Sequence, residues 1–236
     1  MTSKRFVSSI SWRYNVLFRA CVWDLDGTLL NTLPTILHYC NQSLAHFGFH
    51  SIVMEDCRDL CRLPISHFYH RLLELGGCPP QDIERLQPAI RDYDCASYLS
   101  DFMYLTEPYE GVRETLKALQ DMGVQNAVLT NKPDALAHSL IERFFGGLMQ
   151  ACIGQTPKTI SKPDPRSMDR VLEALGVQRS EILYVGDTDV DMQTAHNTGT
   201  AAAAACWGYQ SIEQLLPYKP AYIVHAPRDL VSIFRR

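Results

Sequence analysis

The chain has 236 residues, of which 46% are hydrophobic, so it is long enough to bury a large apolar core. Its formal net charge is −4 and its pI is about 6.0, which provides no basic field for nucleic acid. No apolar run approaches the ~20 residues that span a bilayer. The composition therefore argues against a nucleic-acid-binding or membrane protein, and we expect small molecules as partners.

The cysteine spacing indicates the cellular compartment of the protein, and the first residues indicate where its folded core begins. Eight cysteines are scattered along the chain without the paired spacing that binds zinc, so we expect reduced thiols in a cytoplasmic protein. Residues 1–16 are expected to form an N-terminal extension, because chain termini are often poorly ordered outside a folded core.

Short apolar segments alternate with amphipathic segments along most of the chain. Amphipathic helices are predicted over 111–123 and 165–176, and each ends in a glycine suited to a helix C-terminus. This alternation indicates an α/β fold, with a Rossmann-like, doubly wound parallel sheet and helices on both faces. The predicted strands are 20–24, 124–130, 151–154, 181–187, 201–206 and 221–224.

The alanine run at 201–205 needs a separate argument. Alanine favours helix, so intrinsic propensity predicts a helix here. The run follows a helical segment that ends near Gly199 and precedes the sequence WGY, which favours a buried strand of small side chains. We predict a strand.

One stretch does not follow the alternation of strands and helices. Residues 32–48 and 65–77 have helical patterns, and no buried strand is recognised around them. Residues 33–104 are therefore predicted to form a helical cap domain inserted after the first strand. The core domain is predicted to comprise 17–32 and 105–236.

Polar side chains follow the predicted strands, and the carboxyl ends of parallel strands are where ligands bind. In the sequence CVWDLDGT, Asp24 and Asp26 are two residues apart and are expected to face one pocket. Two close carboxylates repel each other unless a cation lies between them or one keeps a proton. The second strand ends in Thr130, whose hydroxyl joins the same edge.

The later strands add a lysine and two more carboxylates: Lys162 in TISKPDP, and Asp187 and Asp191 in LYVGDTDVDM. Carboxylate oxygens suit Mg²⁺, which also takes phosphate oxygens, while a lysine and a hydroxyl suit the remaining phosphoryl oxygens. Each residue alone also fits a turn, a helix cap or a surface charge. Their order after successive strands favours phosphoryl transfer.

On these residues the chain resembles the haloacid dehalogenase (HAD) superfamily of phosphohydrolases. The segments DLDGT, LTN, KPDP and GDTDVD are similar to its four motifs in order, and the expected cap lies where the family places one. The similarity covers residue 18 to the C-terminus. Within the superfamily, PYEGVRETLKALQDMG, LTNKPD, SKPDP and WGY most resemble the phosphoglycolate phosphatase branch.

The resemblance implies catalytic and metal-binding roles for three aspartates. Asp24 is expected to attack phosphorus and form an aspartyl-phosphate. Asp26 is expected to protonate the leaving alkoxide and then to take a proton from the attacking water. Asp24, Asp187 and the backbone carbonyl of Asp26 are the expected Mg²⁺ ligands. Asp26 also argues against dehalogenation, because halide leaves without a proton.

The remaining matched residues are expected to bind the phosphoryl group or to support the site. Thr130, Asn131 and Lys162 are the expected phosphate-binding residues. The supporting residues are expected to be Gly27, Thr28 and Asp191, of which Gly27 allows a tight turn toward the cap and Asp191 acts through water or the lysine.

The resemblance predicts a magnesium-dependent phosphatase for a small phosphomonoester, with 2-phosphoglycolate as the leading candidate, acting as a monomer or homodimer. Alternatives are a phosphosugar mutase of the beta-phosphoglucomutase kind, a pyrophosphatase, a phosphatase for nucleotides or sugar phosphates, and a phosphate-binding protein without turnover. Arg62 lies where related caps place a specificity loop, so it is either a contact for a carboxylate or sugar hydroxyl, or a surface arginine.

Overall fold

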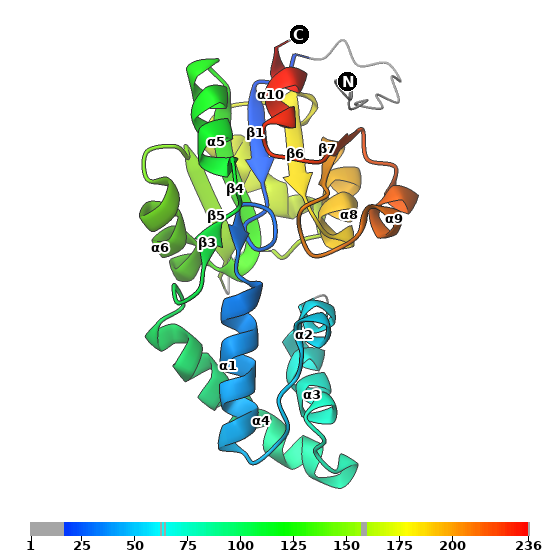
Figure 1. The fold of residues 1–236 in the computed structure, drawn as a ribbon. Coiled ribbons are helices and arrows are strands. Elements are labelled where there is room, and N and C mark those ends of the chain that lie inside the picture. The colour runs from blue at the N-terminus through cyan, green and yellow to red at the C-terminus, as the bar shows by residue number, and fades with distance from the viewer. Residues whose placement is uncertain (1–16, 62, 64, 157–159, 236) are drawn as a thin grey trace, which may run out of the picture. The chain divides into compact units, whose positions relative to one another are not determined.

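The computed structural model describes residues 17–61, 63, 65–156 and 160–235 (Figure 1). The chain divides into two compact units. One unit is Asn31–Glu107, where the sequence placed the inserted cap at 33–104. The other contains the described residues on both sides of that insert, and we refer to it as the core unit.

A six-stranded sheet forms the centre of the core unit, with strand order β5-β4-β1-β6-β7-β8. Every neighbouring pair in the sheet is parallel. The strands are β1 (Ala20–Trp23), β4 (Gln125–Pro133), β5 (Ala151–Gln155), β6 (Ile182–Gly186), β7 (Ala201–Ala205) and β8 (Tyr222–Val224). The predicted α/β fold with a parallel sheet is therefore confirmed.

Helices and short turns connect these strands. The helices are α5 (Val112–Asp121), α6 (Asp134–Phe145), α7 (Asp169–Leu175), α8 (Asp189–Thr198), α9 (Ile212–Leu215) and α10 (Asp229–Phe234). The 3₁₀ turns are η1 (Pro165–Met168), η2 (Arg179–Glu181) and η3 (Leu216–Tyr218). Two short strands, β2 (Leu30–Asn31) and β3 (Glu107–Pro108), pair where the chain leaves the core and returns to it.

The sheet carries helices on both faces (Figure 1). Alternate residues of β1 point to opposite faces, so Ala20 and Val22 join a cluster that includes Val171 of α7 and Ala195 of α8. On the other face, the side-chain amide of Asn126 in β4 donates to a carbonyl of α5. The strands are buried on both faces, as a parallel sheet requires.

The alanine run is a strand, as its position in the sequence predicted. Ala203, Ala204 and Ala205 of β7 are fully buried between β6 and β8. Met192 of α8 and Leu215 of α9 pack against Ala204. Small side chains leave room for these two large ones, so tertiary packing overrides the helix propensity of alanine.

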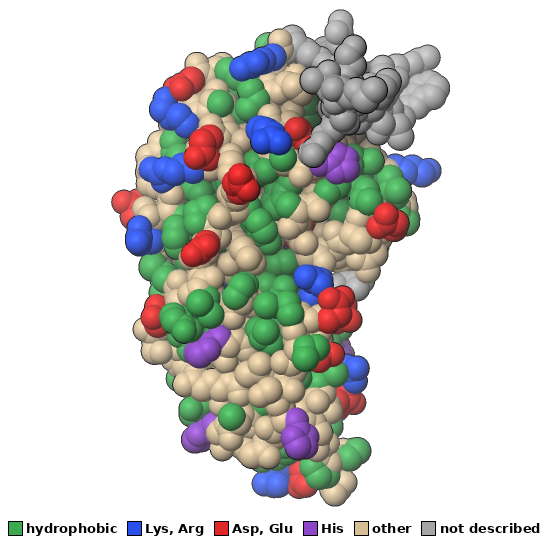
Figure 2. All heavy atoms as spheres, viewed as in Figure 1, with side chains coloured by type: hydrophobic (Ala, Val, Ile, Leu, Met, Phe, Trp, Pro, Cys, Tyr) green, Lys and Arg blue, Asp and Glu red, His purple; other side chains and the backbone are tan. Residues whose placement is uncertain are grey.

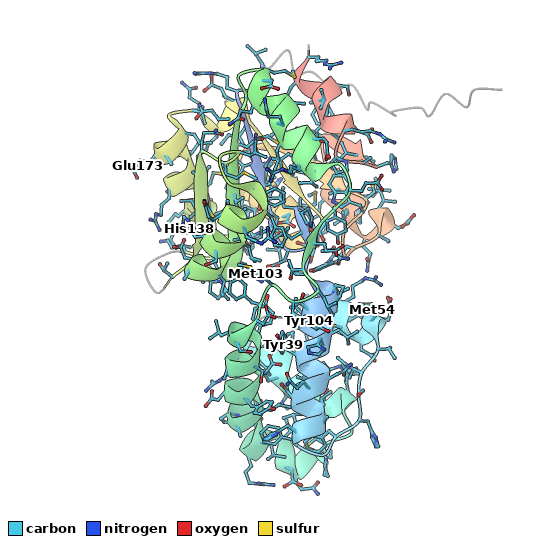
Figure 3. The ribbon with its side chains drawn as sticks, turned by 60° about the vertical axis from the view of Figure 1, so that its left-hand side comes forward. Tyr39, Met54, Met103, Tyr104, His138 and Glu173 are labelled. Atoms are coloured by element: carbon cyan, nitrogen blue, oxygen red, sulfur yellow. The ribbon has the colours of Figure 1, made fainter. Side chains whose placement is uncertain are left out.

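The inserted unit is helical. Its helices are α1 (Leu33–His46), α2 (Met54–Leu60), α3 (Ile65–Leu75) and α4 (Pro80–Ser100). Among their buried side chains is a carboxylate, Asp94, which accepts hydrogen bonds from the hydroxyls of Ser43 at 2.9 Å and Tyr69 at 3.0 Å. Figure 3 marks Tyr39 of α1, whose hydroxyl donates to the backbone of Asp101 beyond α4.

Acidic and basic side chains alternate over the face drawn in Figure 2, in keeping with the small net charge. The eight cysteines are all free thiols, as expected from their scattered spacing. Among the described helices, none combines the length and the apolar character needed to cross a membrane.

Candidate active site

Asp24 lies directly beyond β1, at the carboxyl edge of the sheet. Its amide donates to the Val185 carbonyl at 2.9 Å, which continues the pairing of β1 with β6 by one residue. Its side chain is buried, and its Oδ1 accepts a hydrogen bond from Lys162 Nζ at 2.7 Å. Within the described part of the chain, Oδ2 of Asp24 accepts no hydrogen bond, so this oxygen remains available for chemistry.

Lys162 is buried among acceptors. Besides Asp24, its Nζ donates to Asp191 Oδ1 at 2.8 Å and to the Tyr184 hydroxyl at 3.1 Å. Burial alone lowers the pKa of a lysine, but the carboxylates of Asp191 and Asp24 outweigh it and raise the pKa of Lys162 well above its usual value. The two carboxylates therefore favour the charged form of this lysine.

Asp191 joins this lysine to the start of α8. Its Oδ2 accepts hydrogen bonds from the Thr188 amide at 3.0 Å and the Thr188 hydroxyl at 2.6 Å, which cap the helix N-terminus. A Cβ on Gly186 would lie 2.3 Å from the Cβ of Asp191, so only glycine fits there. Helix α8 begins directly after Thr188 and places Asp191 against Lys162.

Asp187 is fully buried at the end of β6 and held from two directions. Its Oδ1 accepts from the Thr28 hydroxyl at 2.6 Å, and its Oδ2 accepts from the Tyr209 amide at 2.7 Å. A Cβ on Gly27 would lie 2.3 Å from Oδ2, and one on Gly208 would lie 2.2 Å from the Asp187 Cβ. Gly27 also has φ +86°, so it serves both the turn and this close approach.

The carboxylates form a cluster that suits a hard cation. One carboxylate oxygen from each of Asp24, Asp187 and Asp191 lies within 4.8 Å of the others. Burial, together with the charge of Asp191, raises the pKa of Asp24 to about 7 despite the opposing effect of Lys162. The same two causes, with Asp24 added, raise the pKa of Asp187 well above its usual range. Burial and the repulsion between these aspartates both disfavour their charged forms, and a bound cation would relieve the repulsion. Oxygen donors of this kind fit Mg²⁺.

Asp191 belongs to this cluster although the expected metal set was Asp24, Asp187 and the carbonyl of Asp26. Oδ1 of Asp191 already accepts from a cation, Lys162, whereas the two partners of Asp187, the Thr28 hydroxyl and the Tyr209 amide, are neutral. Asp191 is therefore better placed to orient the lysine than to bind a cation directly.

Asp26 has a partner that the sequence reasoning missed. Lys132 Nζ donates to its two carboxylate oxygens at 3.0 and 3.3 Å, and the lysine side chain is only 7% exposed. Lys132 lies two residues beyond Thr130, in a continuation of β4 that runs to Pro133, whereas the strand was predicted to end at Thr130. From the sequence alone, a lysine in a polar segment is expected to lie on the surface. The extension of β4 to Pro133 is what brings Lys132 to the site, and the sequence did not predict that extension.

The two expected phosphate-binding residues of β4 differ in their contacts. Thr130 is buried, and its hydroxyl accepts from the Lys132 amide at 3.1 Å. The Asn131 side chain instead exchanges two hydrogen bonds with the backbone of Lys162, at 2.9 and 3.1 Å. Asn131 thus holds the lysine segment in place. Arg62, the expected specificity residue, lies outside the described residues.

Comparison with known proteins decides the family. Residues 21–205 match the family model of haloacid dehalogenase-like hydrolases. A phosphoglycolate phosphatase of Pseudomonas syringae pathovar tomato is 31% identical over 89% of this chain and 77% of that protein. An N-acetylmuramic acid 6-phosphate phosphatase of Pseudomonas aeruginosa is 27% identical over 92% of this chain and 95% of that one.

The chain belongs to the haloacid dehalogenase-like hydrolases. It is an enzyme of this family that resembles the phosphoglycolate phosphatases, so the predicted family and the predicted phosphatase class are confirmed. Solved structures agree on the fold. One from Lactobacillus delbrueckii subsp. bulgaricus, provisionally assigned as a phosphoglycolate phosphatase, has a TM-score of 0.84 with 23% identity, covering 93% and 99% of the two chains.

A second solved structure supports the same fold at lower identity. A haloacid dehalogenase-like hydrolase of Streptococcus pneumoniae has a TM-score of 0.75 with 21% identity, and the match covers 92% of this chain and 99% of that one. Within this hydrolase fold, three of the motifs lie on or directly after β1, β4 and β6, which are neighbours in the sheet (Figure 1). The third motif, which contains Lys162, follows β5 and reaches Asp24 through the lysine side chain.

Proposed function

We propose that this hydrolase is a magnesium-dependent phosphatase that acts on a small phosphomonoester through a phosphorylated Asp24. The observation that carries the proposal is the arrangement around Asp24. Lys162 fixes one of its carboxylate oxygens at 2.7 Å, Asp187 and Asp191 lie within 4.8 Å, and its second oxygen is left for reaction.

Asp24 is the proposed nucleophile. Its free oxygen attacks phosphorus, so the Asp24–phosphorus bond forms as the bond from phosphorus to the substrate's ester oxygen breaks. Lys162 binds the phosphoryl oxygens and offsets the charge of Asp24 as the anionic substrate approaches. Mg²⁺, held by Asp24, Asp187 and the Asp26 carbonyl, would supply further charge neutralisation for the phosphoryl oxygens.

Asp26 is the proposed proton carrier in both halves of the reaction. It donates a proton to the departing alkoxide, and it then takes one from the water that attacks the phosphorus of phospho-Asp24. The second step releases inorganic phosphate and restores Asp24. Lys132 contacts both oxygens of Asp26, and we propose that it keeps this carboxyl turned toward the reacting atoms.

The substrate class rests on the named relatives. The phosphoglycolate phosphatases support 2-phosphoglycolate as the first candidate. The relative that acts on N-acetylmuramic acid 6-phosphate supports a sugar phosphate as the second. Both are phosphate monoesters of small metabolites, and we propose that the expected contact from Arg62 selects between such substrates.

The test is phosphate release from a panel of substrates, with Mg²⁺ and with EDTA, beside the Asp24→Asn variant. The panel contains 2-phosphoglycolate, N-acetylmuramic acid 6-phosphate, glucose phosphates, nucleoside monophosphates and pyrophosphate. We expect one monoester to be turned over far faster than the others, only with Mg²⁺, and not by Asp24→Asn.

Two outcomes would contradict a phosphatase. Conversion of one glucose phosphate isomer into another, without phosphate release, would indicate a mutase. A rise in melting temperature with Mg²⁺ and fluoroaluminate, without turnover of any substrate on the panel, would indicate a phosphate-binding protein.

A further inference from the structure

The hydroxyl of Tyr184 is a buried group of the active site that the proposed reaction does not use. Tyr184 lies in β6 and is fully buried. Its hydroxyl accepts a hydrogen bond from Lys162 Nζ at 3.1 Å, and it lies 3.2 Å from both Asp191 Oδ1 and the Leu129 carbonyl oxygen. A hydroxyl has one proton to donate, so it donates to one of these two acceptors at a time. That proton therefore has an acceptor whether or not Lys162 contacts the hydroxyl.

The ammonium group of Lys162 has three N–H donors, and each of them already has an acceptor. The acceptors are Asp24 Oδ1 at 2.7 Å, Asp191 Oδ1 at 2.8 Å and the Tyr184 hydroxyl at 3.1 Å. The proposed function requires that Lys162 also bind a phosphoryl oxygen. One of the three acceptors therefore has to give way when phosphate arrives.

The Tyr184 hydroxyl is the acceptor that is displaced at the least cost. It is the uncharged one and the most distant of the three, and hydrogen bonds between charged groups are shorter and stronger. Its displacement leaves no buried donor unpaired, because the hydroxyl proton keeps Asp191 or Leu129 as its acceptor. Loss of the contact with Asp24 or Asp191 would instead leave a buried carboxylate without its cation, which is strongly unfavourable.

We propose that Tyr184 is a positioning residue for Lys162, whose hydroxyl holds the ammonium group before substrate binds and then yields its place to a phosphoryl oxygen. This inference rests on the proposed function, because it concerns the same phosphate site. The hydroxyl competes for the N–H that phosphate needs, so it lowers the affinity of the site for phosphate. The product of hydrolysis is therefore held less tightly than it would be without this hydroxyl.

The Tyr184→Phe variant removes the hydroxyl and keeps the ring. Lys162 Nζ lies 5.8 Å from the centroid of the Tyr184 ring, and phenylalanine also provides this contact between a cation and an aromatic face. Tyr222→Phe is the matched control, because it removes a hydroxyl from β8, which is separated from β6 by β7. The readout is calorimetric binding of inorganic phosphate to the full chain with Mg²⁺, which needs no turnover.

Tyr184→Phe should bind phosphate about tenfold more tightly than the wild type, because phosphate provides an acceptor for the N–H that the variant leaves unpaired. Tyr222→Phe should bind phosphate as the wild type does. Without ligand, Tyr184→Phe should melt at a lower temperature than the wild type, and phosphate should raise its melting temperature by the larger amount. Loss of a purely structural contact would give unchanged or weaker binding instead.

Infrared difference spectroscopy follows the displacement in the wild type itself. Phosphate binding should shift the C–O stretching band of a tyrosine, identified with ring-deuterated tyrosine, because the phenol oxygen loses the N–H that it accepts. The shifted band should be absent from Tyr184→Phe and present in Tyr222→Phe.

The inference is overturned if Tyr184→Phe binds phosphate no more tightly than the wild type does, or if no tyrosine band shifts on binding. Absence of phosphate binding by the wild type would overturn the proposed function as well. A wild type that binds phosphate, but releases none from any substrate on the panel, would contradict the proposed hydrolysis alone.

Discussion

Lys162 Nζ lies 2.7 Å from the Asp24 carboxylate, although the two residues are 138 positions apart in the sequence. Both side chains are buried, and the same ammonium group also contacts Asp191 at 2.8 Å. A buried charge pair is weak evidence for stability, because desolvation offsets much of the attraction. The pair is better explained by the proposed chemistry, in which a lysine lies beside the nucleophile.

Removal of this lysine charge provides the first prediction. Lys162→Met should lower kcat/KM by at least ~100-fold, because the phosphoryl group loses its cation. It should also destabilise the protein by about 3 kcal/mol, since buried carboxylates are left unpaired. Enzyme assays and denaturant unfolding measure the two effects. Lys117→Met, which breaks an exposed pair with Asp121, is the control and should change neither activity nor, beyond ~0.5 kcal/mol, stability. Wild-type activity in Lys162→Met would refute the assigned role.

The Lys132–Asp26 pair provides the second prediction. Lys132→Met should lower kcat about tenfold or more while KM changes little, because Asp26 loses the partner that fixes its orientation. Steady-state kinetics separate the two constants. Lys132→Arg should recover part of kcat, since a guanidinium also pairs with a carboxylate. A change in KM alone would show that Lys132 contacts substrate and does not position Asp26.

Gly208 provides the third prediction, because a Cβ there would overlap Asp187 at 2.2 Å. Gly208→Ala should raise the Mg²⁺ concentration needed for half-maximal activity by about tenfold or more, since small displacements of ligands weaken metal sites. Gly147→Ala is the control: Gly147 has φ +79° with open space around it, so this change costs about 1 kcal/mol of stability only. An unchanged Mg²⁺ requirement in Gly208→Ala would show that Asp187 is not a ligand.

Asp94 in the inserted unit provides a prediction about pH. Burial raises its pKa, although hydrogen bonds from Ser43 and Tyr69 act in the opposite direction. The folded chain therefore keeps this proton to higher pH than the unfolded chain does. The stability that this group contributes is complete below its unfolded pKa, near ~3.9, and is lost as pH rises through the folded pKa.

Asp94→Asn should remove this loss. The variant should melt at a higher temperature than the wild type near neutral pH, and the difference should vanish below about pH 4. The hydroxyls of Ser43 and Tyr69 can donate to or accept from the amide, so the hydrogen bonds persist. Asp92→Asn, at an exposed position on the same helix, controls for the change in net charge. Lower stability of Asp94→Asn at every pH would contradict the prediction.

The sequence predicted the fold and the principal carboxylates because both depend on simple periodic rules. Apolar runs identified the strands, and parallel strands bring the residues at their carboxyl ends together. Asp24 and Asp187 follow β1 and β6, which are neighbours in the sheet, so their convergence could be foreseen. The strand at 201–205 was predictable from its position in the alternation, and not from the propensity of alanine.

Other features depend on contacts that no local pattern encodes. The pairing of Lys132 with Asp26 requires β4 to extend beyond Thr130. The Asn131 side chain bonds the backbone of Lys162, which lies 31 residues further along the chain. Gly208 was noticed only within WGY, and its contact with Asp187 joins two loops that follow different strands.

Chemical trapping of phosphorylated Asp24 tests the central claim most directly. The wild type, Asp24→Asn and Asp26→Asn would be mixed with p-nitrophenyl phosphate and Mg²⁺, quenched in acid, digested and analysed by mass spectrometry. This substrate has a leaving group that departs without a proton, so Asp26→Asn should still be phosphorylated and should then hydrolyse slowly.

We predict phosphate on the peptide that contains residue 24 in the wild type, a larger amount in Asp26→Asn, and none in Asp24→Asn. Phosphate release by the wild type without any phosphorylated peptide, together with turnover by Asp24→Asn, would contradict the account and would indicate direct attack by water.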